Sequence, residues 1–157
     1  QRTTIEADCV ELVARCKADG ADAAILVPNC PVCHQSVALA ARALEASGIA
    51  TVIMGCARDI VEHVGAPRLL FSDFPLGNGA GRPGDIASQD ETLELALSLL
   101  EQATVPRATV QSPLRWSADA AWKLDYCNID RLSAEDIAAR RAQFDSAKSA
   151  VKAGRGL

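Results

Sequence analysis

Three short, continuous apolar runs alternate with segments of helical periodicity, and this alternation is the strongest constraint on the fold. The runs cover residues 21–28, 49–55 and 68–74. Runs that are apolar on both faces are typical of buried parallel strands. Apolar side chains recur at helical spacing in five segments, residues 4–19, 31–47, 57–64, 87–102 and 133–152. This order predicts a three-layer α/β/α fold with a small parallel sheet, Rossmann-like or flavodoxin-like.

The boundaries of this sheet follow less directly from the sequence. The first predicted element is a helix, so we expect further strands upstream of Gln1 or from another chain. We divide the chain into an α/β domain of residues 1–130 and a C-terminal helical tail of the same domain, residues 131–157. The segment 104–131 has no clear periodicity, and its aromatic residues Trp116, Trp122 and Tyr126 are expected to cover the core or a subunit interface.

Composition excludes several classes of protein. The 157 residues carry a formal net charge of −4, which argues against a nucleic-acid binder. No apolar run approaches the roughly 18 residues that a membrane span requires. We see no export signal, so we expect a cytoplasmic protein whose six cysteines are mostly reduced. Alanine is abundant, with 29 residues, and small side chains suit close packing of helices on a sheet.

The tail differs in charge from the rest of the chain. Residues 131–157 hold six basic and three acidic residues, whereas residues 1–130 hold ten basic and seventeen acidic residues. A positively charged segment of this kind is a solvated helix or a strap that binds an acidic neighbouring subunit.

Reactive residue types follow all three predicted strands. Ligands of open parallel sheets bind beyond the carboxyl ends of the strands, so these residues are expected to converge at one edge. The candidates are Asn29, Cys30, Cys33, His34, Cys56, Arg58, Asp73, Gly77 and Asn78.

The motif Cys30-Pro31-Val32-Cys33 is the clearest chemical signal. Proline is favoured at the first helical position, which places Cys30 at the N-cap, where free N–H groups and the helix dipole stabilise a thiolate. Cys33 then lies on the same side and can close a disulfide, so Cys30 is predicted to be a nucleophile and Cys33 its resolving thiol. A structural zinc site and inert thiols are the alternatives. Zinc sites of that kind usually use two ligand pairs, and no metal is expected here.

The other candidates each have two interpretations. His34 is a proton donor, a group that tunes the thiolate, or a residue of the helix surface. Cys56 faces Cys30 across the sheet edge or is a buried thiol at a strand end. Arg58 binds a substrate carboxylate through two hydrogen bonds or is an exposed arginine at a helix start.

The remaining assignments are simpler. Asp73 and the loop residues Gly77 and Asn78 contact the substrate, or the loop is a flexible connection or lid. Asn29 is grouped with these substrate-binding residues. Cys9 and Cys16 lie seven residues apart on a helical face and are predicted to be small buried hydrophobes.

Three stretches of the chain resemble a known family. They are residues 19–52, which contain the Cys-Pro-Val-Cys motif, the run from Arg58 to Val64 with Pro67 and Arg68, and the loop FPLGNGAGRPGD at residues 74–85. They resemble the B-subunit selenoproteins of the glycine, sarcosine, betaine and D-proline reductases, most of all the D-proline reductase branch. In the glycine-reductase branch a further cysteine stands where this chain has Ser36, which again favours the proline-type branch.

The resemblance implies reductive cleavage of a carbon–nitrogen bond in a small amino-acid-like substrate. By position, Cys30 stands where the family has selenocysteine, and Cys33 matches the resolving cysteine. No cofactor is expected in this chain; a pyruvoyl group on a partner subunit would activate the amine. The chain is then an oxidoreductase subunit within a homo- or hetero-oligomer. Two features depart from the family, which has selenocysteine and a longer N-terminal region.

Two other functions remain open. A cofactor-independent racemase or lyase would use Cys30 and Cys56 as its acid–base pair. A non-catalytic redox or assembly subunit would dock onto a larger enzyme.

Overall fold

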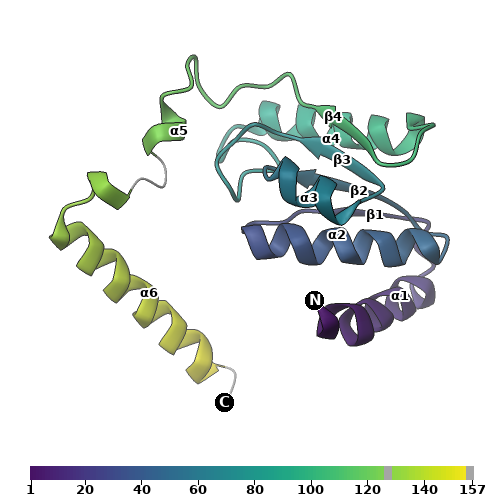
Figure 1. Cartoon of the computed structure of the whole chain (residues 1–157), viewed down its shortest axis with the longest axis horizontal. Helices are drawn as coiled ribbons and strands as arrows, with labels where there is room; N and C mark the ends of the chain where they lie inside the picture. Colours follow the sequence, from purple (N-terminus) through teal and green to yellow (C-terminus); the bar gives the residue numbers. More distant parts are fainter. Residues whose placement is uncertain (126–128, 155–157) are drawn as a thin grey trace. The chain divides into compact units, whose positions relative to one another are not determined.

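Four parallel strands form one sheet, in the same order as along the chain (Figure 1). The computed structural model describes residues 1–125 and 129–154. The strands are β1 (Ala23–Leu26), β2 (Ala50–Gly55), β3 (Arg68–Phe71) and β4 (Ala108–Gln111). Ile53 of β2 pairs with Leu26 on one side and Leu69 on the other. Because all strands run the same way, their carboxyl ends meet at one edge, as the sequence predicted.

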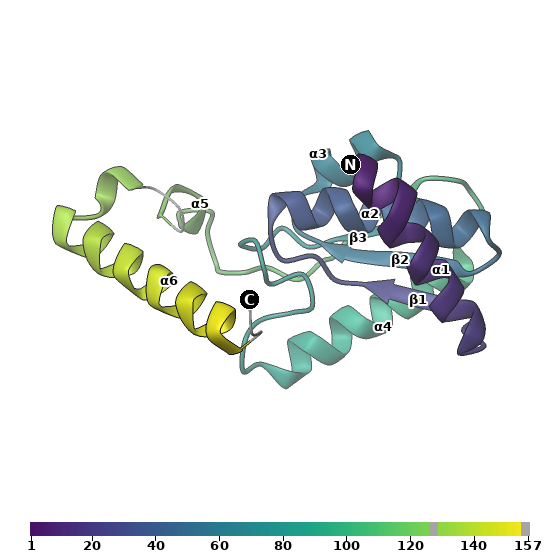
Figure 2. The ribbon, with the colours of Figure 1, turned by 90° about the horizontal axis from the view of Figure 1, so that it is seen from below.

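Helices cover both faces of the sheet, which confirms the predicted α/β fold (Figure 2). They are α1 (Cys9–Ala18), α2 (Pro31–Ala46), α3 (Arg58–Val64) and α4 (Ile86–Gln102), with a π-helical turn, η1 (Thr4–Asp8), before α1. The helices α2 and α3 lie on one face, and α4 lies on the other. The first helix, α1, packs against α2.

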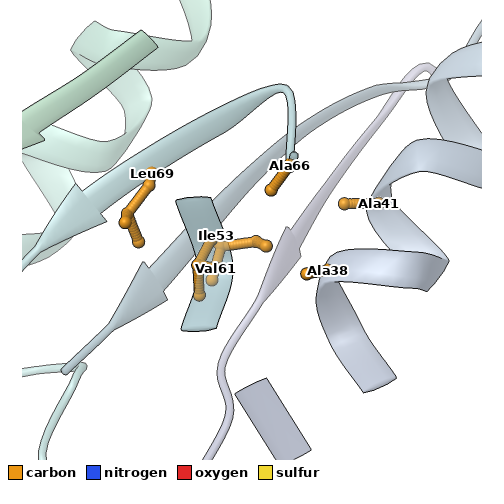
Figure 3. Packing of buried hydrophobic residues seen from close by; sticks show 6 residues of the cluster. All are labelled: Ala38, Ala41, Ile53, Val61, Ala66 and Leu69. Atoms are coloured by element: carbon orange, nitrogen blue, oxygen red, sulfur yellow. The ribbon is translucent and has the colours of Figure 1, made fainter. Parts of the chain in front are cut away.

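The core is split between the two faces because side chains alternate along a strand. Ile53 and Leu69 point toward α2 and α3, where they meet Ala38 and Ala41 (Figure 3). Their strand neighbours point toward α4; this second cluster comprises Val52, Met54, Leu70, Ala96 and Leu99. The methyl groups of Ala38 and Ala41 are fully buried, so α2 lies close to the sheet.

The strand β4 was not predicted, because the segment 104–131 was expected to be irregular. Residues 108–111 contain no continuous apolar run; Ala108 and Thr109 are half-buried, and Val110 and Gln111 are exposed. Its position depends on pairing with β3, and hydrogen bonds extend this pairing at both ends: the Ala108 N–H donates to the carbonyl of Pro67, and the Ser112 N–H donates to that of Phe71. A strand fixed by a partner far away in the sequence has little local signal.

The glycine-rich segment before α4 carries the chain across the carboxyl edge of the sheet. Strands β2, β3 and β4 are neighbours in this order across the sheet. The helix α3 connects β2 to β3 over one face, whereas α4 connects β3 to β4 over the other. The two crossover connections therefore have opposite handedness. The crossing segment, residues 72–85, passes directly over β2. A Cβ on Gly79 would lie 2.5 Å from the carbonyl oxygen of Met54, so only glycine fits there.

The chain divides into two compact units, Gln1–Trp116 and Ser117–Leu157. The second unit contains α5 (Trp122–Asp125), a 3₁₀ turn, η2 (Ile129–Arg131), and α6 (Ala134–Gly154). Ser133 and Asp136 cap α6 reciprocally: the Asp136 N–H donates to Ser133 Oγ, and the Ser133 hydroxyl donates to the Asp136 carboxylate. The division at residues 130/131 stays a prediction. Tyr126 and Cys127 lie outside the described residues.

Trp116 contributes to the cover of the core, as predicted for the aromatic residues of segment 104–131. Trp116 packs edge-on against Phe74, with ring centroids 5.5 Å apart. Phe74 is buried, so this contact extends the core of the first unit. Within residues 1–125 and 129–154, no helix has the length and apolar character needed to cross a membrane.

Candidate functional site

The Cys-Pro-Val-Cys motif forms the first turn of α2, as the sequence predicted. Cys30 is the N-cap, with extended backbone angles of φ −120° and ψ 168°, and Pro31 is the first helical residue. The backbone N–H of Cys33 donates to Cys30 Sγ over 3.2 Å. The helix therefore directs a free N–H group, together with its positive end, at the first sulfur.

The two sulfurs of the motif are adjacent. Cys30 Sγ and Cys33 Sγ lie 2.6 Å apart and share a hydrogen bond, and both cysteines are free thiols. A disulfide requires about 2.05 Å between the sulfurs, so a small movement would close the bond. The hydrogen bond with Cys30, supported by backbone hydrogen bonds, lowers the pKa of Cys33 from its ordinary value. Cys30 is the exposed member.

His34 does not lie on the helix surface; that expectation is wrong. Its side chain is fully buried. Nδ1 lies 2.8 Å from the carbonyl oxygen of Cys30, and Nε2 accepts the backbone N–H of Cys56 over 3.0 Å. Both ring nitrogens are therefore engaged with the backbone, and the predicted role of proton donor has no support from this geometry. Periodicity could not reveal this contact, because the ring bonds to a residue 22 positions further along the chain.

Cys56 directly follows β2, beneath the glycine-rich segment, and is half-buried. Burial raises its pKa to about 11, against smaller, opposing contributions from backbone hydrogen bonds of Asn78 and Phe74. The negative charge of Asp73 raises it further. The thiol is therefore protonated at neutral pH. This environment matches the interpretation of Cys56 as a buried thiol at a strand end.

The glycine-rich segment brings the other predicted residues to the same edge. Gly77 lies beside the segment that joins β1 to α2, since a Cβ on it would be 3.8 Å from the Asn29 carbonyl oxygen. Asn78 donates its side-chain amide to the Pro75 carbonyl over 3.0 Å, so that group is used inside the loop. Asn29 is exposed beside Cys30. Substrate contacts by Asn29, Asp73, Gly77 and Asn78 stay predictions.

Arg58 is engaged on its own helix. Its Nε donates to Glu62 Oε1 over 2.8 Å, one turn further along α3, and Arg58 is the main cause that lowers the pKa of Glu62. The side chain is about half exposed. This geometry fits the interpretation of an exposed arginine at a helix start, and the predicted contact with a substrate carboxylate stays a prediction.

A groove next to the motif was not anticipated. It has a volume of about 520 Å³ and runs between the first turns of α2 and the helix α3. Its lining is Pro31, Val32, Gln35, Asp59, Ile60, His63 and Val64. The high exposure of Val32, 69%, gives the groove an apolar wall inside the motif itself. The sequence signal that could have indicated this groove is Val32, an apolar residue between two cysteines at the exposed start of a helix.

The other cysteines of the described chain are separate from this site. Cys9 is buried, as predicted, and burial raises its pKa. Cys16 is only half-buried. Among residues 1–125 and 129–154, no three His, Cys, Asp or Glu side chains cluster in a way that could hold a metal ion.

Comparison with known proteins gives one partial likeness. Over 75 residues, 48% of this chain, the sequence is 35% identical to D-proline reductase subunit gamma of Acetoanaerobium sticklandii. That alignment spans about a third of the relative's length, 31%. The chain matches no protein-family profile and no solved structure. The likeness therefore links this chain to a reductase subunit and leaves the reaction open.

Proposed function

We propose that this chain is a thiol-dependent reductase subunit whose Cys30–Cys33 pair cleaves a carbon–nitrogen bond in a small amino-acid-like substrate. The observation that carries the proposal is the pair itself: two free thiols 2.6 Å apart at a helix N-terminus, the first of them exposed. The partial likeness to D-proline reductase subunit gamma supports the class of reaction.

The step uses the two thiols in sequence. The Cys30 thiolate attacks the carbon that bears the amine, a carbon–sulfur bond forms, and the nitrogen leaves with its electron pair and takes a proton. The Cys33 thiolate then attacks Cys30 Sγ, and the carbon–sulfur bond breaks. The carbon keeps the electron pair of that bond and takes a proton. The substrate gains two electrons, and the pair becomes a disulfide. An external dithiol reductant returns it to the thiol form.

A partner subunit completes the enzyme in this proposal. Sulfur is a weaker nucleophile than the selenium of the resembled family, so the substrate carbon needs strong activation. We assign that activation to a carbonyl group, the pyruvoyl group of the resemblance, on the partner. This chain contributes the nucleophile, the resolving thiol and the sheet edge that holds them.

The experiment that tests the proposal separates the roles of the two thiols. The protein is mixed with glutathione disulfide and digested for peptide mass spectrometry, alongside Cys30→Ser, Cys33→Ser and the control Cys16→Ser. We expect the unsubstituted protein and Cys16→Ser to form the Cys30–Cys33 disulfide. Cys33→Ser should instead retain glutathione on Cys30. If Cys30 reacts no faster than Cys16 and no internal disulfide forms, the proposal fails.

The same variants test the acid–base alternative. A racemase or lyase that uses Cys30 and Cys56 retains activity in Cys33→Ser and loses it in Cys56→Ser. A pKa of about 11 weighs against Cys56 in that role, because an efficient acid or base has a pKa near the working pH.

A further inference from the structure

A buried histidine joins the redox motif to the end of strand β2. His34 donates its backbone N–H to the Cys30 carbonyl over 2.9 Å, and its Nδ1 lies 2.8 Å from the same oxygen. On the other side of the ring, Nε2 accepts the backbone N–H of Cys56 over 3.0 Å. One fully buried side chain thus connects the N-cap residue with the sheet edge.

These partners assign one tautomer to the ring. A backbone N–H can only donate, so Nε2 must be the acceptor, and Nδ1 must carry the proton that goes to the Cys30 carbonyl. The opposite tautomer would place two N–H groups against each other and a nitrogen lone pair against the carbonyl oxygen. A neutral ring with its proton on Nδ1 is the form that satisfies both contacts.

Strand β2 ends in a glycine where the ring lies. A Cβ on Gly55 would come within 3.2 Å of His34 Cδ2 and 3.3 Å of Nε2, closer than ordinary van der Waals contact. The ring is therefore packed directly against the strand backbone, with little freedom to shift.

We infer that His34 is a positioning residue for the Cys30–Cys33 pair. By fixing the Cys30 carbonyl on the end of β2, it holds the N-cap geometry in which Cys30 Sγ accepts the Cys33 N–H and lies beside Cys33 Sγ. The inference rests on the proposed redox function of the pair. Loss of the hydrogen bond from Nδ1 would loosen the first turn of α2 and disfavour closure of the disulfide.

Two substitutions test the contacts of the two ring nitrogens separately. In His34→Asn, the side-chain amide N–H can replace Nδ1–H toward Cys30, but the contact with Cys56 is lost. In His34→Gln, the amide oxygen can replace Nε2 toward Cys56, but the donor to Cys30 is lost. Each variant loses one hydrogen bond, so their effects on fold stability should be similar.

The measurement is the equilibrium constant for exchange between the dithiol and glutathione disulfide, determined in each folded protein by quenched mass spectrometry. We expect His34→Gln to lower this constant about five- to tenfold, and His34→Asn clearly less. The control Thr92→Val removes a buried hydrogen bond in α4, from Thr92 Oγ1 to the Ser88 carbonyl. It should reduce stability and leave the constant unchanged.

The outcomes distinguish this inference from the proposed function. If the unsubstituted protein forms no Cys30–Cys33 disulfide, the proposed function fails. If the disulfide forms with the same constant in all His34 variants, or His34→Asn is the more affected one, only the positioning role is overturned. Should neither variant fold, Gly55→Ala keeps the histidine and displaces its ring. We then expect a smaller decrease of the constant, and no decrease would contradict the inference.

Discussion

Three thiols at one sheet edge have different environments, because each sulfur has different neighbours. Cys30 is exposed at the N-cap and accepts a backbone N–H. Cys33 shares a hydrogen bond with it, and its pKa is lowered. Cys56 lies beneath the glycine-rich segment, where burial raises its pKa to about 11. Reactivity is therefore expected from the pair at the start of α2, and little from Cys56.

The raised pKa of Cys56 predicts a contribution of this thiol to the pH dependence of stability. Its pKa is 9.0 in an ordinary setting and about 11 in the fold. Below pH 9 the thiol is protonated in both folded and unfolded chains, and its contribution is fully present. Between pH 9 and 11 the unfolded chain releases the proton first, so the contribution is lost as the pH rises.

Urea unfolding at several pH values tests this expectation. The free energy of unfolding of the unsubstituted protein should decrease more steeply between pH 9 and 11 than that of Cys56→Ala. The difference between the two proteins isolates Cys56 from other groups that titrate in this range. Parallel curves would show that the thiol is not protected in the fold.

At the scale of elements, the glycine-rich segment leads the chain to α4, on the face of the sheet opposite α2 and α3, and covers Cys56. It begins after β3, passes across the carboxyl end of β2 and ends at the start of α4. Backbone groups of Phe74 and Asn78 in this segment lie at the Cys56 sulfur. The close approach of Gly79 to the Met54 carbonyl fixes the height of the segment above the strand.

Gly79→Ala should therefore displace the segment. The added Cβ has no space above the Met54 carbonyl, so we expect a loss of about 1–3 kcal/mol in the free energy of unfolding. Cys56 should also react faster with iodoacetamide at pH 8. Ala80→Ser, at the next and exposed position, is the control and should change stability by less than about 0.5 kcal/mol. Unchanged stability in Gly79→Ala would contradict this packing.

Local signals predicted the elements that carry their own pattern. The apolar runs gave β1, β2 and β3, and Pro31 gave the N-cap position of Cys30. The strand β4 was missed because Ala108–Gln111 depends on hydrogen bonds from β3. His34 was misplaced because its partner Cys56 is distant in the sequence. The face of the sheet that α4 covers was also not predicted, because the composition of the preceding loop does not show to which face the chain crosses.

At the scale of the molecule, the candidate site belongs to the unit Gln1–Trp116. Segments after β1, β2 and β3 all reach its carboxyl edge, as expected of a parallel sheet. The pair is exposed at that edge, His34 lies buried behind it, and the groove between α2 and α3 runs beside it. This arrangement leaves Cys30 accessible to an incoming substrate or partner. Cys33 Sγ lies close enough to react with Cys30 Sγ without a large movement of the backbone.

The most direct test of the account is the pH dependence of alkylation of the pair. The whole protein is treated with iodoacetamide across a pH series, before and after mild oxidation, and labels on Cys30 and Cys33 are quantified by mass spectrometry. Because the pKa of Cys33 is lowered, we expect this thiol to begin to react at a lower pH than an ordinary cysteine, and we expect oxidation to protect Cys30 and Cys33 together. If both label as ordinary free thiols and oxidation protects neither, the pair is not the redox centre of this protein.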